Sequence, residues 1–169
     1  MTVEDLNRLP FDAARAELER CCGASSWVER LCAARPFRDR DHLLSEAERG
    51  ARALTPGDWR EAFSHHPRIG DLDSVRARFG STAAWAADEQ RGAAGATEST
   101  LRALAEGNRA YEEKFGYIFI VCATGKGAGE MLALLESRLQ NDADVELGIA
   151  AEEQSKITRL RLEKLLSGP

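Results

Sequence analysis

The stretch TPGDWREAFSHHP (residues 55–67) carries both the start and the end of one helix. Thr55 supplies a capping hydroxyl and Pro56 suits the first helical turn, so the pair predicts a helix start. Pro67 biases His66 away from the α region and toward an extended conformation, so the helix is expected to end just before this pair. The stretch therefore predicts a sharply bounded helix that leads into a rigid histidine-proline corner.

Signals of the same kind recur along the rest of the chain. Ser25-Ser26, Asp41 and Thr97 are expected helix caps, and apolar residues recur at helical spacing between them. Helices are expected over about 11–21, 25–35, 41–51, 55–65, 72–79, 81–90, 97–115, 129–139 and 142–166. Residues 115–122 alone look strand-like, and because one strand cannot make a sheet we expect buried extended backbone there. The prediction is an all-α bundle of about eight helices, with residues 1–169 as one domain.

Composition narrows the functional class. The chain has 169 residues, a formal net charge of −5 and a pI near 5.3, which argues against nonspecific nucleic-acid binding. We expect no membrane span, because the longest apolar run is far too short, and the acidic residues 1–5 do not resemble a signal peptide. A cytoplasmic location is the default expectation. The spacing of Cys21, Cys22, Cys32 and Cys122 matches no zinc pattern, so structural thiols in helices are expected.

His66 is the first candidate for chemistry. A histidine held in a non-helical corner can direct its imidazole into a cleft, and it titrates near neutral pH. A surface or helix-capping histidine is the alternative, because most histidines are not catalytic.

A carboxylate is the second candidate. Glu89 lies four residues after Trp85 and three after Ala86, so the three can share a helix face where the carboxylate resists ionisation. Gln90 adds an amide that both donates and accepts hydrogen bonds. A solvated acidic patch is the alternative interpretation.

Arg161 and the strand-like segment complete the set. Arg161 is expected to project toward the core beside Leu160, whereas Arg159 points elsewhere. An inward arginine needs an anion, which is either a carboxylate of this protein or a ligand. Main-chain groups around Phe119 and Val121 lack helical partners, so they can bind an amide-rich ligand or pair with another loop.

Seven motifs, taken in order along the chain, resemble the family of 2-oxo-4-hydroxy-4-carboxy-5-ureidoimidazoline (OHCU) decarboxylases, enzymes of uric acid degradation. Each is weak alone, but their order and spacing are specific. They are Leu6–Pro10, Cys22–Val28, Arg35–Phe37, His66–Gly70, Glu89-Gln90, Lys114–Ile120 and Lys156–Leu162.

The resemblance implies an all-helical homodimer that acts on a small molecule and needs no metal or organic cofactor. It implies that His66 and Glu89 are catalytic. Pro67, Gln90, Phe119, Val121 and Arg161 match substrate-binding positions. The implied reaction is decarboxylation of OHCU to (S)-allantoin.

One departure keeps alternatives open. The family often has serine three residues before the glutamate, and this chain has Ala86. Loss of one hydrogen bond to substrate costs on the order of 1 kcal/mol, which weakens binding without abolishing activity. A noncatalytic helical ligand-binding protein, or a decarboxylase of a related purine-derived acid, remains the alternative.

Overall fold

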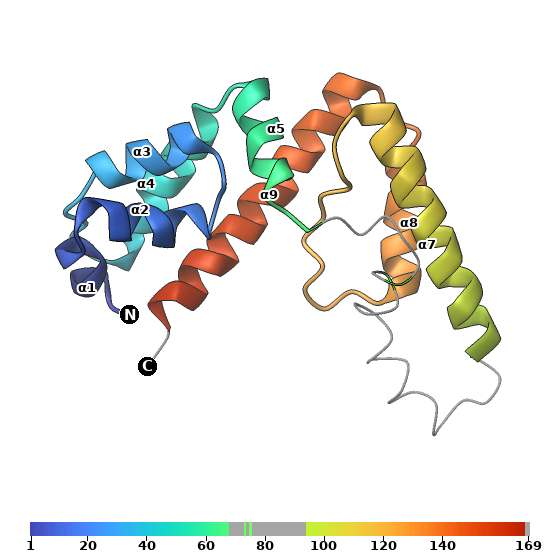
Figure 1. The fold of residues 1–169 in the computed structure, drawn as a ribbon, viewed down its shortest axis with the longest axis horizontal. Coiled ribbons are helices and arrows are strands. Elements are labelled where there is room, and N and C mark those ends of the chain that lie inside the picture. Colours follow the sequence, from blue (N-terminus) through green and yellow to red (C-terminus); the bar gives the residue numbers. More distant parts are fainter. Residues whose placement is uncertain (68–72, 74, 76–93, 168–169) are drawn as a thin grey trace. The chain divides into compact units, whose positions relative to one another are not determined.

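The computed structural model describes residues 1–67, 73, 75 and 94–167. This part of the chain forms eight helices and no strand, so the predicted all-α class is confirmed (Figure 1). None of the described helices is both long enough and apolar enough to cross a membrane. The helices expected over 72–79 and 81–90 fall almost wholly outside the described residues. The bounds are α1 Val3–Arg8, α2 Phe11–Glu19, α3 Ser25–Ala33, α4 Arg40–Arg52, α5 Pro56–Ser64, α7 Ala94–Phe115, α8 Ala128–Arg138 and α9 Ala143–Leu166.

The helix within residues 55–67 begins and ends as predicted. Thr55 caps α5 in a capping box with Asp58, and Pro56 occupies the first turn. His65 is the C-cap, so α5 ends directly before His66. A similar box between Thr2 and Asp5 caps α1, a helix that the sequence analysis missed.

Three other predicted caps are wrong. Asp39, not Asp41, caps α4, because its extended backbone lets Oδ1 accept from the amide of His42 at 2.7 Å. Helix α7 already begins at Ala94, upstream of Thr97.

The predicted cap at Ser25-Ser26 is the third. Ser25 lies inside the first turn of α3, after the N-cap Ala24. The carboxylate of Glu61 on α5 accepts from the Ser25 amide at 3.1 Å and from its hydroxyl at 2.5 Å. A side chain from another helix thus takes over the capping role and ties α3 to α5.

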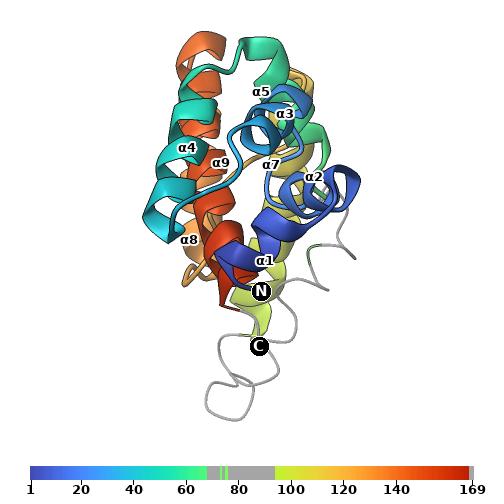
Figure 2. The same ribbon diagram turned by 90° about the vertical axis from the view of Figure 1, so that its left-hand side faces the viewer.

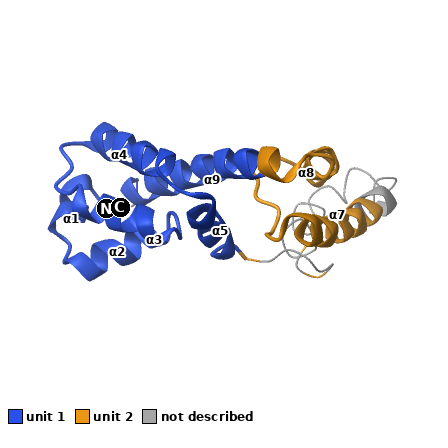
Figure 3. Ribbon diagram, turned by 90° about the horizontal axis from the view of Figure 1, so that it is seen from above, with its two compact units in different colours: residues 1–66, 147–169 blue, residues 67–146 orange. Residues whose placement is uncertain are grey.

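Contacts divide the chain into two compact units, residues 1–66 with 147–169 and residues 67–146 (Figure 3). In the first unit, α1 to α5 pack along the later part of α9 (Figures 1 and 2). Trp27 is fully buried in its core and donates from Nε1 to the carbonyl of Ala47 at 3.0 Å. The prediction of one domain stays a prediction.

The second unit is built on close packing of α7 against α8. Gly107 permits this approach, because a Cβ there would lie 2.7 Å from Cδ2 of Leu135. Residues 116–122 follow α7 without forming a strand. Three of their side chains are buried, as expected for extended buried backbone: Tyr117, Ile120 and Val121.

Candidate active site

The histidine-proline corner closes the last turn of α5. The amide of His66 donates to the carbonyl of Phe63 at 3.2 Å, and His66 is half-buried whereas Pro67 is exposed. The ring of the preceding His65 lies against Gly23, where a Cβ would come within 2.2 Å of its Cγ. Only glycine leaves room for this contact, so the corner rests directly on the loop between α2 and α3.

Helix α9 holds the imidazole of His66. Nε2 of His66 lies 2.6 Å from Oε1 of Gln154, a fully buried side chain in the middle of α9. Nε2 of Gln154 in turn donates to the hydroxyl of Thr158, one helical turn later, at 3.2 Å. His66 is therefore fixed by a buried amide whose own second end is also bonded.

The buried face of α9 differs from the predicted one. Leu160 is 41% exposed, so its placement on the apolar face is wrong. The buried stripe instead advances four residues at a time. Its members are Ala150, Gln154, Thr158 and Leu162.

Arg161 borders this stripe. It is half-buried while Arg159 is exposed, as expected. Its Nη1 donates to the carbonyls of Arg20 and Cys21, at 3.3 and 3.5 Å, just past the end of α2. Within the described residues these hydrogen bonds go to main-chain carbonyls rather than to a carboxylate. The guanidinium is thus placed by backbone contacts.

Cys21 and Cys22 are two buried thiols close to Arg161 and Thr158. Burial raises the pKa of Cys21 to about 11, against the opposing charge of Arg161. Burial also raises the pKa of Cys22, opposed by hydrogen bonds from the Ala24 backbone and the Thr158 side chain. Both cysteines are free thiols that follow α2, and Cys122 lies in the extended segment after α7, so the expected helical position is wrong for these three and right only for Cys32 in α3. Cys21 and Cys22 act as buried neutral groups.

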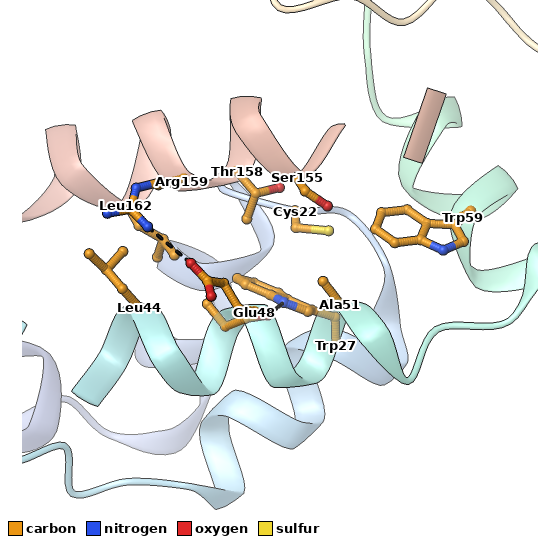
Figure 4. A pocket seen from close by; sticks show the side chains of 11 residues that line it. Cys22, Trp27, Leu44, Glu48, Ala51, Trp59, Ser155, Thr158, Arg159 and Leu162 are labelled. Carbon is orange, nitrogen blue, oxygen red and sulfur yellow. Dashed lines mark hydrogen bonds and ion pairs between the residues drawn. The ribbon is translucent and has the colours of Figure 1, made fainter. Parts of the chain in front are cut away.

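A small apolar pocket lies beside the stripe. Thr158 and Ser155 project from α9 toward Cys22, and the Arg159–Glu48 ion pair, at 3.0 Å, crosses from α9 to α4 (Figure 4). The volume of the pocket is about 30 Å³, so it has room for one or two water molecules and not for a ring-sized substrate. We therefore assign this pocket to packing.

In the second unit, a buried arginine holds the extended segment. Arg138 donates from Nη1 to the carbonyl of Ile120 at 2.7 Å, and its guanidinium carbon lies 4.7 Å from the ring centre of Phe119. The carboxylate of Glu146 accepts from Nε of Arg138, also at 2.7 Å. The main chain between Phe119 and Val121, two of the predicted binding positions, is thus fixed at its central residue.

The other predicted site residues lie outside the described part of the chain. They are Glu89 and Gln90, together with Ala86, the departure from the family pattern. Within the described ranges, no three His, Cys, Asp or Glu side chains come together as metal ligands would.

The sequence profile of the family described as OHCU decarboxylase matches residues 7–163. The chain belongs to the OHCU decarboxylase family. This confirms the resemblance noted from the sequence motifs.

Individual relatives agree with this family. The uric acid degradation bifunctional protein TTL of Arabidopsis thaliana is 37% identical over 94% of this chain, and the chain spans 49% of that protein's length. The OHCU decarboxylase of Haloferax volcanii is 26% identical, with 99% of this chain and 97% of that protein covered. A crystal structure of an OHCU decarboxylase in the presence of (S)-allantoin matches with a TM-score of 0.70 and 37% identity, over 90% of this chain and 98% of that one.

Several OHCU decarboxylase motifs have structural roles here. Asn7 and Phe37 exchange two hydrogen bonds of 2.8 Å, which join the motifs Leu6–Pro10 and Arg35–Phe37. Lys114 donates to the carbonyl of Leu139 at 2.7 Å, which fastens the end of α7 to the end of α8. These motif residues hold the scaffold.

Sequence reasoning missed Gln154, Thr158, Arg138 and Glu146. The first two had a signal, because polar residues four apart on the inward stripe of a helix must find buried partners. Arg138 and Glu146 lie on different helices, so no periodicity connects them. Such a pair becomes visible only in three dimensions.

Proposed function

We propose that this chain catalyses the decarboxylation of OHCU to (S)-allantoin, the last step in the conversion of urate to allantoin. Membership of the OHCU decarboxylase family over residues 7–163 supports this activity. So does the 37% identity to a decarboxylase crystallised in the presence of (S)-allantoin.

The reaction sets clear demands on the site. The substrate carries a carboxylate and a hydroxyl on one ring carbon, and a ureido group on the next. When the bond to the carboxylate breaks, carbon dioxide leaves and the electron pair forms a double bond to the neighbouring carbon that bears the ureido group, while the ring nitrogen on that carbon takes up a proton. The resulting enol must be stabilised, its hydroxyl must lose a proton to become the carbonyl, and the carbon that bears the ureido group must be protonated on one face only. Positioning and electrostatic stabilisation can supply this without a cofactor.

We assign the proton transfers to His66 and Glu89, at the substrate hydroxyl and at the carbon that bears the ureido group. Arg161 grips a carboxylate or ureido oxygen, because a guanidinium presents two parallel donors to such groups. Main-chain groups of Phe119 and Val121 hold the ring, Gln90 offers an amide, and Pro67 shapes the corner.

The observation that carries the assignment of His66 is its contact with Gln154. The 2.6 Å bond ties the imidazole to the helix that carries Arg161. Gln154 and Arg161 are seven residues apart, which is about two turns and places them on one helix face. Helix α9 thus carries both Arg161 and the residue that holds the imidazole of His66.

Stereochemistry gives the direct test. OHCU is generated in place from urate with urate oxidase and the hydrolase that follows it, and circular dichroism then reports optically active allantoin. The proposal predicts a protein-dependent signal faster than the racemic background. Ligand binding with only the background rate would favour the noncatalytic alternative, with Ala86 as the first suspect. Turnover of a different purine-derived acid in a substrate panel would favour the altered-substrate alternative.

We also propose that the enzyme works as a homodimer in the cytoplasm and needs no metal or organic cofactor, as the family resemblance implies. Light scattering coupled to size exclusion tests the dimer. Unchanged turnover after dialysis against a chelator supports metal independence, and lost turnover restored by a metal ion contradicts it.

A further inference from the structure

We propose that Gln154 is a positioning residue that holds His66 with its proton on Nε2, so that Nδ1 is the nitrogen that exchanges protons during the reaction. This inference rests on the proposed function for its catalytic part. Its structural part concerns only the contacts of the first unit.

The roles of the two ends of Gln154 follow from its chemistry. An amide oxygen only accepts hydrogen bonds, and an amide nitrogen only donates them. Oε1 faces Nε2 of His66 at 2.6 Å, and Nε2 of Gln154 faces the Thr158 hydroxyl at 3.2 Å. An imidazole nitrogen that faces an acceptor must carry the proton.

The two distances favour this orientation of the amide over its flipped form. A hydrogen bond from nitrogen to oxygen spans 2.7–3.2 Å, so the 3.2 Å contact suits it and the 2.6 Å contact lies just below its lower limit. In the flipped amide the Thr158 hydroxyl would donate to an oxygen at 3.2 Å, beyond the usual 2.5–3.0 Å range. The flip would also put two nitrogens 2.6 Å apart.

Burial stabilises this orientation of the Gln154 amide. Gln154 is fully buried and Thr158 is nearly so, and hence neither end of the amide can turn to bulk water for a substitute partner. Cys22, a buried thiol, lines the same small pocket as Thr158. Loss of one link would leave a buried polar atom unpaired.

The arrangement has a consequence for catalysis. Nε2–H is bonded to Gln154 in both the neutral imidazole and the imidazolium, so the ring keeps one orientation while Nδ1 gains and loses its proton. A histidine held in the wrong tautomer cannot accept a proton at the required nitrogen. Gln154 therefore acts on the reaction through His66 without touching substrate.

Nitrogen-15 NMR of the histidine side chains tests the assignment on the full-length protein, with His66→Asn identifying the His66 signals. At a pH where His66 is neutral, the wild type is expected to show a protonated Nε2 and an unprotonated Nδ1. Gln154→Met keeps the length of the side chain but removes the acceptor, so the other tautomer should gain population. The kcat of Gln154→Met for OHCU should fall roughly 10- to 100-fold, and KM should change less. A loss of this size is typical when a metal-binding histidine loses the hydrogen-bond partner of its second ring nitrogen.

Companion variants separate positioning from packing. Thr158→Val removes the acceptor for the Gln154 amide and should shift the tautomer in the same direction, whereas Thr158→Ser should restore the wild-type tautomer. Ser155→Ala, on the same helix, removes only a hydroxyl bonded to the Ala151 carbonyl and should leave the tautomer unchanged. If Gln154→Met does not fold, Thr158→Val carries the test.

A wild-type His66 protonated on Nδ1 overturns the proposal, as does a folded Gln154→Met with unchanged tautomer and kcat. The expected tautomer in a wild type that does not turn over OHCU supports the role of Gln154 and contradicts the proposed function instead.

Discussion

Arg138 and Glu146 form a buried ion pair in the second unit, with Nη2 and Oε1 2.5 Å apart. The carboxylate also accepts from the Tyr111 hydroxyl and from Nδ2 of Asn141. Arg138 also donates a hydrogen bond from Nη1 to the carbonyl of Ile120. The pair therefore joins α7, α8, α9 and the extended segment through one set of hydrogen bonds.

Breaking this pair should cost far more stability than breaking an exposed one. Glu146→Gln leaves the Arg138 charge buried without its counterion, and we expect the free energy of unfolding to fall by about 3–5 kcal/mol. Arg102→Ala, which breaks the exposed α7 pair with Glu98, should cost at most about 0.5 kcal/mol. Urea unfolding measures both changes, and equal losses in the two variants would contradict the role given to the buried pair.

A methyl group at Gly23 should disturb the corner. Gly23→Ala places a Cβ 2.2 Å from Cγ of His65, so we expect a loss of about 1–3 kcal/mol in stability and reduced OHCU turnover. Gly57→Ala is the control in α5, where the new Cβ would lie 3.6 Å from Thr55 Oγ1, an ordinary contact. Thermal unfolding and turnover are measured together. A Gly23→Ala protein as stable and active as Gly57→Ala would show that the contact is unimportant.

Arg161 should matter for substrate affinity. In Arg161→Lys a single ammonium replaces the planar guanidinium. The ammonium cannot keep the main-chain contacts of Arg161 and also bind an oxyanion with two parallel donors. We expect KM for OHCU to rise roughly 10- to 100-fold, in line with about 1.5–3 kcal/mol for a charge-assisted hydrogen bond.

Arg159→Lys is the matched control, because Arg159 is exposed and pairs with Glu48 and Glu163. It should leave KM unchanged. Equal effects of the two lysine variants would remove the substrate-binding assignment of Arg161.

Stability at alkaline pH should depend on Cys21. The folded protein holds the pKa of this thiol near 11, whereas the ordinary value is 9.0. Between these values the unfolded chain releases the proton and the folded chain keeps it, so the free energy of unfolding falls as pH rises from about 9 to 11. The maximal slope from one such group is about 1.4 kcal/mol per pH unit.

Cys21→Ala should flatten this part of the profile, measured by urea unfolding at several pH values. The slope is the readout, because the smaller side chain also lowers stability at every pH. An identical slope in the variant and the wild type would contradict the assignment.

Local signals predicted much of the helical architecture. The Thr55-Pro56 start and the His66-Pro67 stop bound α5 correctly, because capping and proline geometry act between neighbouring residues. The cap at Ser25 failed for the opposite reason. Glu61, distant in sequence, supplies the oxygen that satisfies the first turn of α3. Signals that depend on a partner elsewhere in the chain are invisible to local reasoning.

In the candidate site, too, local signals identified single residues and missed partners that are distant in sequence. His66 and Arg161 stood out because each has an unusual local setting, a proline corner or an inward stripe. Their partners did not, since Gln154 meets His66 across 88 positions of sequence and Arg161 meets the carbonyls past α2 across about 140. Glu89 and Gln90 stay predictions.

We propose that this chain makes (S)-allantoin from OHCU by using His66, and one measurement tests this directly. The measurement is the initial rate of circular dichroism change with freshly generated OHCU, for wild type, His66→Gln and the neighbouring His65→Gln, each with its helical content verified. We expect rapid formation of optically active allantoin by wild type and His65→Gln, and only the slow racemic background with folded His66→Gln. Wild-type rates in His66→Gln would contradict it.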